Sequence, residues 1–446
     1  MENIIPVNGR IAIVDDNINQ ALPLLREFSK HNIPYTYYKG DDYEYLPEQP
    51  ENDIRILFLD LNLLSSRTQQ PKEVKGALLP VLKRIVSPQN YPYILIVWSV
   101  QEKEYLPSLM ELFENELKKC APIAIKKWIK SDYFTYDGEV IQDADFAKII
   151  TSLKAILKDL HAYSYLLQWE NCVHDSANAT VQSIFHESQI NQDWAGEANC
   201  IFDLFAHSYL EKGFSPADDV LKTKSSLLFF NDIFNDTLEQ CIWNQDIENA
   251  CQLKYDNITE EKKHDIKAKV NTHLLLSSQY TSPKHPGCVL GFDSEVDFNL
   301  SKELLNDSTS MASFRPDEKD TKELKQEMHN WRTTVYEMMK PCAIVVTPAC
   351  DHAQNKAKNI RLVRGIIVKD CHREHFDRQS EAIYISPSFN YENNNCILVL
   401  NFRYFFTCQN KVIKDDTVIF RLRSTVLSEI QSKLARHISR QGIMNL

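Results

Sequence analysis

The chain has 446 residues, 43% of them hydrophobic, and a formal net charge of −11. A single hydrophobic core rarely extends beyond about 250–300 residues, so this length predicts two or three domains. The acidic balance argues against broad, charge-driven binding to nucleic acid, and no apolar run reaches the roughly 18–20 residues that a membrane span requires.

The first ten residues, the cysteines and the glycines argue against further classes of protein. The first ten residues, MENIIPVNGR, lack the basic start, the apolar stretch and the small-residue cleavage site of a signal peptide. Eleven cysteines are scattered without a CxxC pair, which is typical of reduced thiols, so we expect a cytoplasmic protein. The ten glycines form neither GxGxxG nor GxxxxGK[ST], which excludes the usual signals of a Rossmann dinucleotide site or a P-loop.

The first third of the chain alternates short apolar runs with amphipathic stretches. Runs of this kind separated by helix-like segments predict a doubly wound, parallel, five-stranded sheet in an α/β domain over residues 1–141. The segment 41–53 is acidic and interrupted by proline, so a helix there is expected to be short or absent. The predicted strands are 11–14, 34–38, 54–59, 93–98 and 122–125, and the predicted helices are 18–31, 73–87 and 103–119.

The middle of the chain is predicted to be helical. Strand signals nearly vanish over 142–280, and the apolar residues of 146–160 recur at the spacing of one helical face. Further helices are expected at 197–212, 216–241 and 259–277. Residues 281–340, rich at first in Pro, Gly, Ser and Asp, are predicted to be a long connection that ends in a helix.

The pattern changes again in the last quarter of the chain. Five β-rich segments between 341 and 423 are separated by polar turns, and apolar residues then repeat at helical spacing over 426–438. Residues 341–446 are therefore predicted to form a small β-barrel or sheet with a C-terminal helix. The fold class expected for the whole chain is multi-domain, with α/β, α-helical and β-rich parts.

Polar side chains follow four of the five predicted N-terminal strands. The carboxyl ends of parallel strands share one edge of a sheet, where open α/β folds bind their ligands. Along the chain an acidic pair is followed by an aspartate, an amide, a hydroxyl and then lysine. The residues are Asp15, Asp16, Asp60, Asn62, Ser99 and either Lys126 or Lys127.

These residue types suit the phosphorylation of an aspartate. The carboxylates of Asp15, Asp16 and Asp60, with the backbone carbonyl of Asn62, offer the oxygen ligands that Mg²⁺ prefers. The Ser99 hydroxyl and a lysine ammonium would each take one phosphate oxygen.

This order and spacing resemble the receiver domain of response regulators. The resemblance covers about the first third of the chain and implies Mg²⁺-dependent transfer of a phosphoryl group to Asp60 from a histidine kinase or another phosphodonor. It also implies a shift of the face formed by the fourth helix and fifth strand. The loop after Asp60 is longer than is usual and lacks the common proline, and proline does not follow the lysine. A degenerate receiver that serves only as a docking module therefore stays open.

Two His-Asp dipeptides lie in the helical region, His174–Asp175 and His264–Asp265. Metal-dependent HD phosphohydrolases use such a pair on a helix, where imidazole and carboxylate together suit a divalent metal. A motif of two residues is weak evidence, and we favour exposed or helix-capping histidines.

A third candidate site follows the first β-rich segment of the last quarter. Cysteine and histidine at such a separation can hold Zn²⁺, but neither half forms a clean CxxC or HxxxH pair, so we favour a turn. A Cys–His–Asp nucleophilic site is disfavoured because adjacent residues on a strand point to opposite faces. The residues are Cys350, Asp351 and His352, then Cys371, His372 and His375.

The function expected from the sequence is that of a bacterial signalling protein. A receiver would control an output that acts by protein–protein contact through the helical and β-rich domains, without membrane attachment. No catalytic motif is recognisable downstream, so we favour a non-enzymatic output. Two alternatives stay open: a docking module in a multi-protein stress or antiviral-defence assembly, and a metal-dependent hydrolase in the output region.

Overall fold

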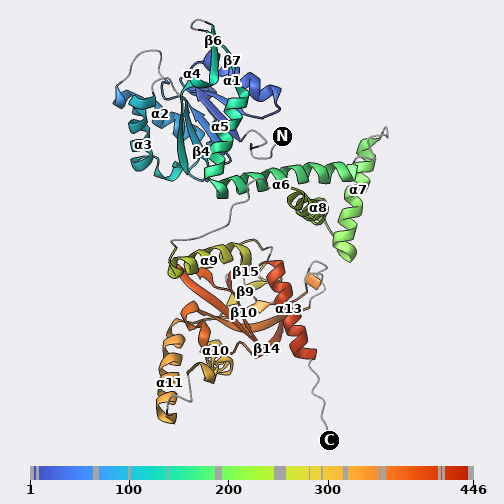
Figure 1. The fold of residues 1–446 in the computed structure, drawn as a ribbon. Coiled ribbons are helices and arrows are strands. Elements are labelled where there is room, and N and C mark those ends of the chain that lie inside the picture. The colour runs from blue at the N-terminus through green and yellow to red at the C-terminus, as the bar shows by residue number, and fades with distance from the viewer. Residues whose placement is uncertain are drawn as a thin grey trace. The chain divides into compact units, whose positions relative to one another are not determined.

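The chain folds into two compact units, Met1–Asn199 with Leu228–Gln252, and Cys200–Leu227 with Leu253–Leu446. The computed structural model, drawn in Figure 1, describes residues 5–6, 10–63, 70–98, 102–137, 140–185, 193–245, 258–280, 282–292, 295–314, 320–348, 351–352, 358–409, 413 and 417–439. Within these ranges no helix combines the length and apolar character needed to cross a membrane.

A five-stranded, all-parallel sheet forms the centre of the first unit. The strand order is β2-β1-β3-β4-β5, which confirms the parallel sheet predicted from the apolar runs. The elements are β1 (Ile11–Asp15), α1 (Ile18–Lys30), β2 (Thr36–Lys39), η1 (Tyr43–Tyr45), β3 (Ile56–Leu59), α2 (Pro71–Ile85), β4 (Ile94–Trp98), α3 (Glu102–Asn115), η2 (Lys118–Cys120), β5 (Ala124–Trp128), α4 (Lys130–Tyr133), β6 (Phe134–Asp137), β7 (Val140–Ala144), α5 (Phe146–Asp159) and α6 (His161–Phe185).

Helices cover both faces of this sheet. Side chains alternate along each strand, so Val14 and Leu59 pack toward α2 and α3, whereas Ile13 and Phe58 pack toward α1 and α5. Burial on both faces explains why the central strands are continuous apolar runs. Figure 1 shows α2 and α3 on one side of the strands, with α1 and α5 on the other.

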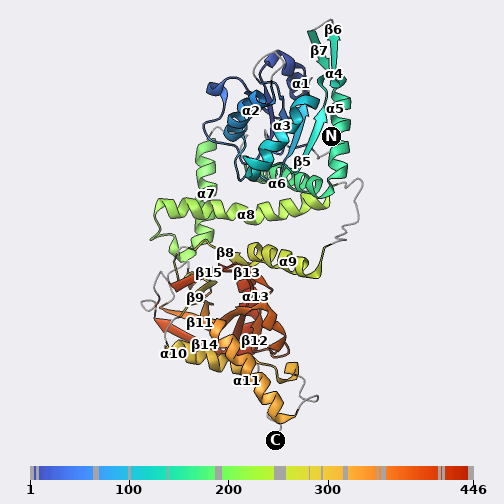
Figure 2. The ribbon, with the colours of Figure 1, turned by 90° about the vertical axis from the view of Figure 1, so that its left-hand side faces the viewer.

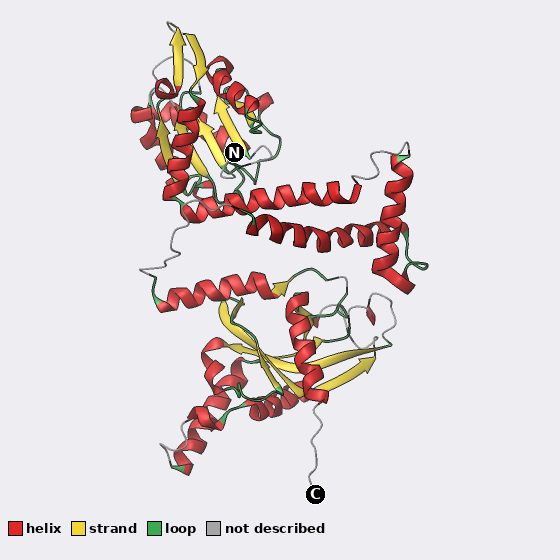
Figure 3. Cartoon of the chain, turned by 45° about the vertical axis from the view of Figure 1, so that its right-hand side comes forward, coloured by secondary structure: helices red, strands yellow, loops and turns green. Residues whose placement is uncertain are grey.

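One feature of the first unit agrees with the expectation, and another differs from it. The acidic stretch 41–53 contains only the single turn η1, as its composition indicated. An antiparallel hairpin of β6 and β7 stands between α4 and α5, and the sequence had suggested no strand there. The hairpin is the pair of arrows at the top of Figure 3.

The helical segment that follows is shared between the two units. Tyr163 and Leu167 of α6 are buried in the same core as α5, so the start of the predicted helical domain belongs to the N-terminal sheet. The next elements are α7 (Trp194–Leu210), η4 (Glu211–Gly213) and α8 (Asp219–Trp243), and two of the three boundaries between the units fall inside α7 and α8. The predicted domain boundary at 141 and the compact units therefore divide the chain differently.

An antiparallel sheet of eight strands forms the centre of the second unit. Its order is β12-β14-β11-β10-β9-β15-β8, with β13 paired to β14. The elements are α9 (Glu260–Leu275), β8 (Leu276–Ser277), β9 (Cys288–Gly291), α10 (Glu295–Ser308), η5 (Met311–Phe314), α11 (Thr321–Met338), β10 (Lys340–Val345), β11 (Asn359–Lys369), η7 (Asp370–His375), β12 (Ile383–Ile385), β13 (Phe389–Tyr391), β14 (Asn394–Gln409), β15 (Val418–Leu422) and α13 (Ser424–Ser439).

Helices also pack on both faces of the second sheet. The apolar side of α13, including Leu427 and Ile430, shares a core with Leu398 of β14. On the opposite face α10 and α11 pack against β11 and β14, and Figure 2 shows these two helices below the strands. Residues 281–340 were expected to be mainly a connection, but they contribute β9, α10 and α11 to this unit. The sequence of β9, CVLG, is short and follows a Pro-Gly pair that is typical of turns, so the sequence did not predict this strand.

A glycine allows the two long strands of the second sheet to approach closely. The β11–β14 register shifts between Val363 and Gly365, and a Cβ at Gly365 would lie 2.5 Å from the carbonyl oxygen of Val399. We expect Gly365→Ala to lower the free energy of unfolding by about 1–3 kcal/mol, because the backbone must shift to admit the methyl group. Urea denaturation measures the change. Gly76→Ala on α2 is the control, since its Cβ would meet nothing within 4 Å; equal losses in both variants would contradict the steric argument.

Candidate functional site

Three carboxylates meet at the carboxyl edge of the parallel sheet. Asp15 ends β1, Asp16 follows it, and Asp60 follows the last residue of β3. Strands β1 and β3 are hydrogen-bonded neighbours, and the Asp60 amide donates to the Val14 carbonyl at 2.9 Å. Asp15, Asp16 and Asp60 each have an oxygen within 4.8 Å of the other two. The structure thus brings together the three aspartates that the sequence proposed.

A buried lysine closes this cluster. Lys130 begins α4, just beyond the end of β5, and its side chain is 1% exposed. Its Nζ donates to Asp15 Oδ2 at 2.8 Å, to Asp60 Oδ2 at 2.5 Å and to Gln20 Oε1 at 3.0 Å. An ammonium group has three N–H donors, so each of them has an acceptor. Lys130 is therefore held in one position between the two buried carboxylates.

Backbone amides orient the other oxygens of the same two carboxylates. The Asn17 amide donates to Asp15 Oδ1 at 2.9 Å, and the Asn62 amide donates to Asp60 Oδ1 at 3.0 Å. Each is a turn in which an aspartate accepts from the amide two residues ahead. Asn62 thus closes the short turn that directly follows Asp60.

Burial and neighbouring charge change the acidity of the site. Burial raises the pKa of Asp15 to about 6; the Lys130 charge opposes this shift and the Asp60 charge adds to it. Burial also raises the pKa of Asp16, with a further contribution from Asp60. Burial alone would lower the pKa of Lys130, but the charges of Asp60 and Asp15 outweigh it and raise that pKa. Lys130 is therefore protonated at neutral pH.

The charge and donor types of the cluster fit a hard divalent cation. With Asp15, Asp16 and Asp60 ionised, their three negative charges and the one positive charge of Lys130 leave a residual charge of −2. Oxygen is the ligand atom that Mg²⁺ prefers, and a divalent ion would neutralise this residual charge. Asp15, Asp16 and Asp60 are the residues that would hold it.

The lysine of the site is Lys130, not Lys126 or Lys127. Both predicted lysines lie inside β5, which continues to Trp128, so neither stands at the carboxyl end of the strand. Among the described strands, β5 ends the order of the sheet and has β4 as its one neighbour. Lysine is common in edge strands, so the strand continues through Lys126 and Lys127 instead of ending before them, as the sequence had predicted.

Two members of the site were missed from the sequence. Lys130 could have been found because Trp128 and Ile129 extend the apolar character of the strand beyond the two lysines. Gln20, on the first turns of α1, carries no sequence signal that distinguishes it from any other helical glutamine. Ser99, the predicted hydroxyl, lies outside the described residues. Its neighbour Trp98 is buried, with its ring centroid 5.3 Å from Lys130 Nζ.

The His-Asp dipeptides are separate from this cluster. His174 lies on α6, where its Nε2 faces the Asn178 amide at 3.3 Å, and Asp175 is exposed. His264 lies on α9 and pairs through Nε2 with Asp370 Oδ2 at 2.5 Å. Asp265 accepts a hydrogen bond from Asn395. Among the described residues the only grouped set of metal-type ligands is the aspartate cluster, so neither dipeptide gathers a metal site there.

The candidate zinc ligands of the C-terminal unit also lie apart. His352 packs its ring 5.1 Å from that of His285, while Asp351 faces Arg361. His372 accepts from the Trp331 indole at 3.2 Å, and His375 stacks on Phe314. Cys371 is exposed, and Cys350 lies outside the described residues. Among the described residues of this set, His372 and His375 both pack against Trp331, whereas His352 and Asp351 contact other residues. The described members do not gather as a group of metal ligands.

The raised pKa of Asp15 predicts that the ionised carboxylate, which a metal site needs, lowers the stability of the folded protein. The pKa of this carboxyl is 3.8 in the unfolded chain and about 6 in the folded protein. Its contribution to stability is therefore fully present below pH 3.8, and it is lost as the pH rises through about 6. We expect Asp15→Asn to raise the free energy of unfolding at pH 7 by about 2–3 kcal/mol, and to have little effect below pH 4. Urea denaturation in EDTA at both pH values measures this. A variant that is less stable than the natural protein at pH 7 would contradict it.

Comparisons with family models, with curated proteins and with solved structures found no match to this chain.

Proposed function

We propose that the N-terminal unit is a phospho-receiver, in which Asp60 accepts a phosphoryl group in the presence of Mg²⁺. The observation that carries the proposal is the pairing of buried Lys130 with both Asp15 and Asp60 at the carboxyl edge of a parallel sheet. Holding two buried carboxylates together costs folding free energy, which is typical of a functional site. The order of the strands and the helices on both faces are those expected for such a domain.

The chemistry follows from the position of each group. An Asp60 carboxylate oxygen attacks the phosphorus of the donor, a P–O bond forms, and the bond from phosphorus to the donor's leaving atom breaks. Mg²⁺ bound by the aspartates would offset the negative charge that gathers there. Lys130, which already contacts Asp60 Oδ2, is placed to pair with an oxygen of the transferred phosphoryl group.

The phosphodonor would be a histidine kinase or a small phosphorylated donor, and the output would be contact with a protein partner. Lys130 lies one turn from Tyr133, whose hydroxyl donates to Ser152 of α5 at 3.1 Å. Phe134 packs edge-on against Trp98 with ring centroids 5.2 Å apart. A displacement of Lys130 would therefore reach α5, and through it α6, by direct contacts.

Beryllofluoride, a mimic of aspartyl phosphate, tests the proposal on the full-length protein. With Mg²⁺ present we expect a saturable change in tryptophan fluorescence, because Trp98 is buried beside Lys130. The change should vanish in Asp60→Asn and in Trp98→Phe, and persist in Asp159→Asn, which alters an exposed aspartate at the end of α5.

Acetyl phosphate gives a chemical readout of the same site. An acyl phosphate on Asp60 is reduced by borohydride to homoserine, which peptide mass spectrometry locates. Homoserine at position 60, absent from Asp60→Asn, would support phosphotransfer. A folded protein that responds to neither reagent would instead be a docking module, and the proposed activity would be wrong.

A further inference from the structure

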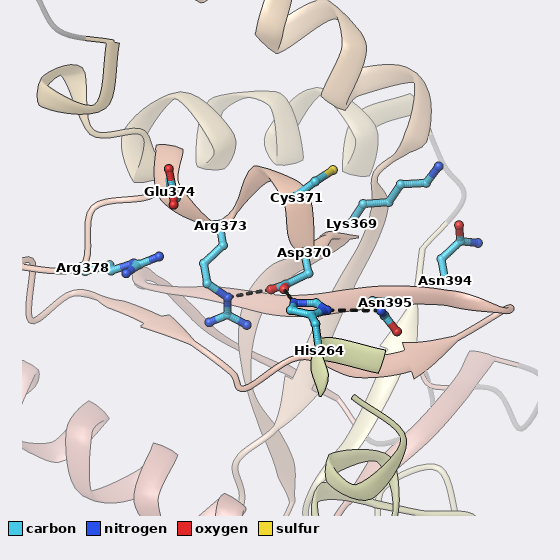
Figure 4. A pocket seen from close by; sticks show the side chains of 9 residues that line it. All are labelled: His264, Lys369, Asp370, Cys371, Arg373, Glu374, Arg378, Asn394 and Asn395. Atoms are coloured by element: carbon cyan, nitrogen blue, oxygen red, sulfur yellow. Dashed lines mark hydrogen bonds and ion pairs between the residues drawn. The ribbon is translucent and has the colours of Figure 1, made fainter. Parts of the chain in front are cut away.

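A basic pocket in the second unit has no part in the proposed phosphotransfer. It has a volume of about 540 Å³, within the range of small-ligand sites. Figure 4 shows side chains from α9, from the end of β11 with η7, and from the start of β14 around it. The lining includes the cations Lys369, Arg373 and Arg378 and the acids Asp370 and Glu374.

The Asp370 carboxylate is already engaged by neighbouring side chains. Arg373 Nε donates to its Oδ1 at 2.6 Å, and His264 Nε2 lies 2.5 Å from its Oδ2. Asn395 Nδ2 faces His264 Nδ1 at 3.3 Å, so the histidine accepts there and donates its Nε2–H to Asp370. These contacts lock Asp370 in place and fix the orientation of the Arg373 guanidinium.

Positively charged groups of the lining remain outside the contact with Asp370. Arg373 uses only Nε for Asp370, which leaves its Nη1 and Nη2 groups outside that contact. Within the described part of the chain, Lys369 and Arg378 form no hydrogen bond or ion pair between side chains, and both are exposed. Figure 4 places Lys369 and Arg378 at opposite ends of the lining, with Arg373 between them.

The charged side chains that line the pocket have a positive sum, although the protein as a whole is acidic. Three cations oppose Asp370 and Glu374, a balance of +1, although the whole chain carries −11. A phosphate group offers three acceptor oxygens, and it can pair with a guanidinium through two parallel hydrogen bonds while a second cation binds the third oxygen. The fixed Arg373 and the unpaired Arg378 supply such a set of donors.

We propose that this pocket binds the phosphate group of a small phosphorylated molecule. Arg373 would bind two phosphate oxygens, and Arg378 or Lys369 the third. Asp370 and His264 act as positioning residues, because they hold Arg373 rather than the ligand. This site is independent of Asp60, so the two proposals can fail separately.

Calorimetric titration of the full-length protein with AMP and with inorganic phosphate tests this site. EDTA is present throughout, so that a metal at the aspartate cluster cannot bind the probes. We expect saturable binding of AMP, weakened about tenfold in Arg373→Gln and in Arg378→Gln, since each removes a charge-assisted contact. Arg436→Gln, an exposed arginine on α13, is the matched control and should bind AMP as the natural protein does.

The two probes and the two variants keep the test decisive. Arg378 is exposed, so its variant should fold even where Arg373→Gln loses the contact with Asp370, and thermal melting verifies this. Binding of inorganic phosphate with the same dependence on Arg378 would support recognition of the phosphate group itself. Absence of saturable binding to both probes, or binding unchanged in both variants, would overturn the proposal.

Discussion

Replacing Lys130 by methionine is expected to lower the free energy of unfolding at pH 7 by about 3–5 kcal/mol. The change leaves the Asp15 and Asp60 carboxylates buried and adjacent without the cation between them, and an unpaired buried charge costs several kcal/mol. Methionine retains the length of the lysine stem, so the loss measures the missing charge rather than a cavity. Urea denaturation followed by tryptophan fluorescence provides the measurement.

A control variant at a lysine of β5 separates the loss of the buried ion pairs of Lys130 from the loss of any one positive charge. Lys127→Met removes an exposed ammonium from β5 and is expected to change stability by less than about 0.5 kcal/mol. In Lys130→Met the residual charge of the cluster becomes −3, so added Mg²⁺ should stabilise this variant more than the natural protein. Equal stability of the two variants would show that Lys130 does not hold the carboxylates together. Labelling by acetyl phosphate should also fall in Lys130→Met.

The acidic half of the site could be predicted because its strands end where their apolar runs end. Asp15 and Asp60 each follow an unbroken buried run, and a parallel sheet places such ends at one edge. The basic half could not be predicted in the same way. β5 is an edge strand and has lysines in its interior. A charged residue marks the end of a buried central strand, but it does not mark the end of an edge strand.

The remaining differences have a similar physical origin. β9 lies between β10 and β15, but its four residues are too few to show an alternating pattern and follow directly after turn residues. The pocket around Asp370 joins residues more than a hundred positions apart, His264 and Asp370, whose contact depends on how α9 packs beside the sheet. Local periodicity predicts elements, but it has no information on such distant pairs.

A second ionic cluster lies at the amino edge of the parallel sheet, opposite the aspartates. Arg10 and Arg55 directly precede β1 and β3, and both form ion pairs with Glu170 of α6. The Arg55 Nε and Nη2 atoms donate to Glu170 Oε1 at 3.0 and 2.8 Å. Tyr163 adds a hydrogen bond from its hydroxyl to the Arg55 carbonyl. The start of α6 is thus attached to the sheet at the edge opposite Asp60.

Glu170→Ala is therefore expected to lower the free energy of unfolding by about 2–3 kcal/mol and to loosen α6 from the sheet. The change leaves two guanidinium groups side by side, with side chains only 11% and 13% exposed, and removes the carboxylate that separates them. Hydrogen–deuterium exchange of residues 163–171 should quicken, because their protection depends on packing against the sheet. Glu116→Ala, at an exposed glutamate after α3, is the control. Exchange in 163–171 that is the same in both variants would show that Glu170 does not anchor α6.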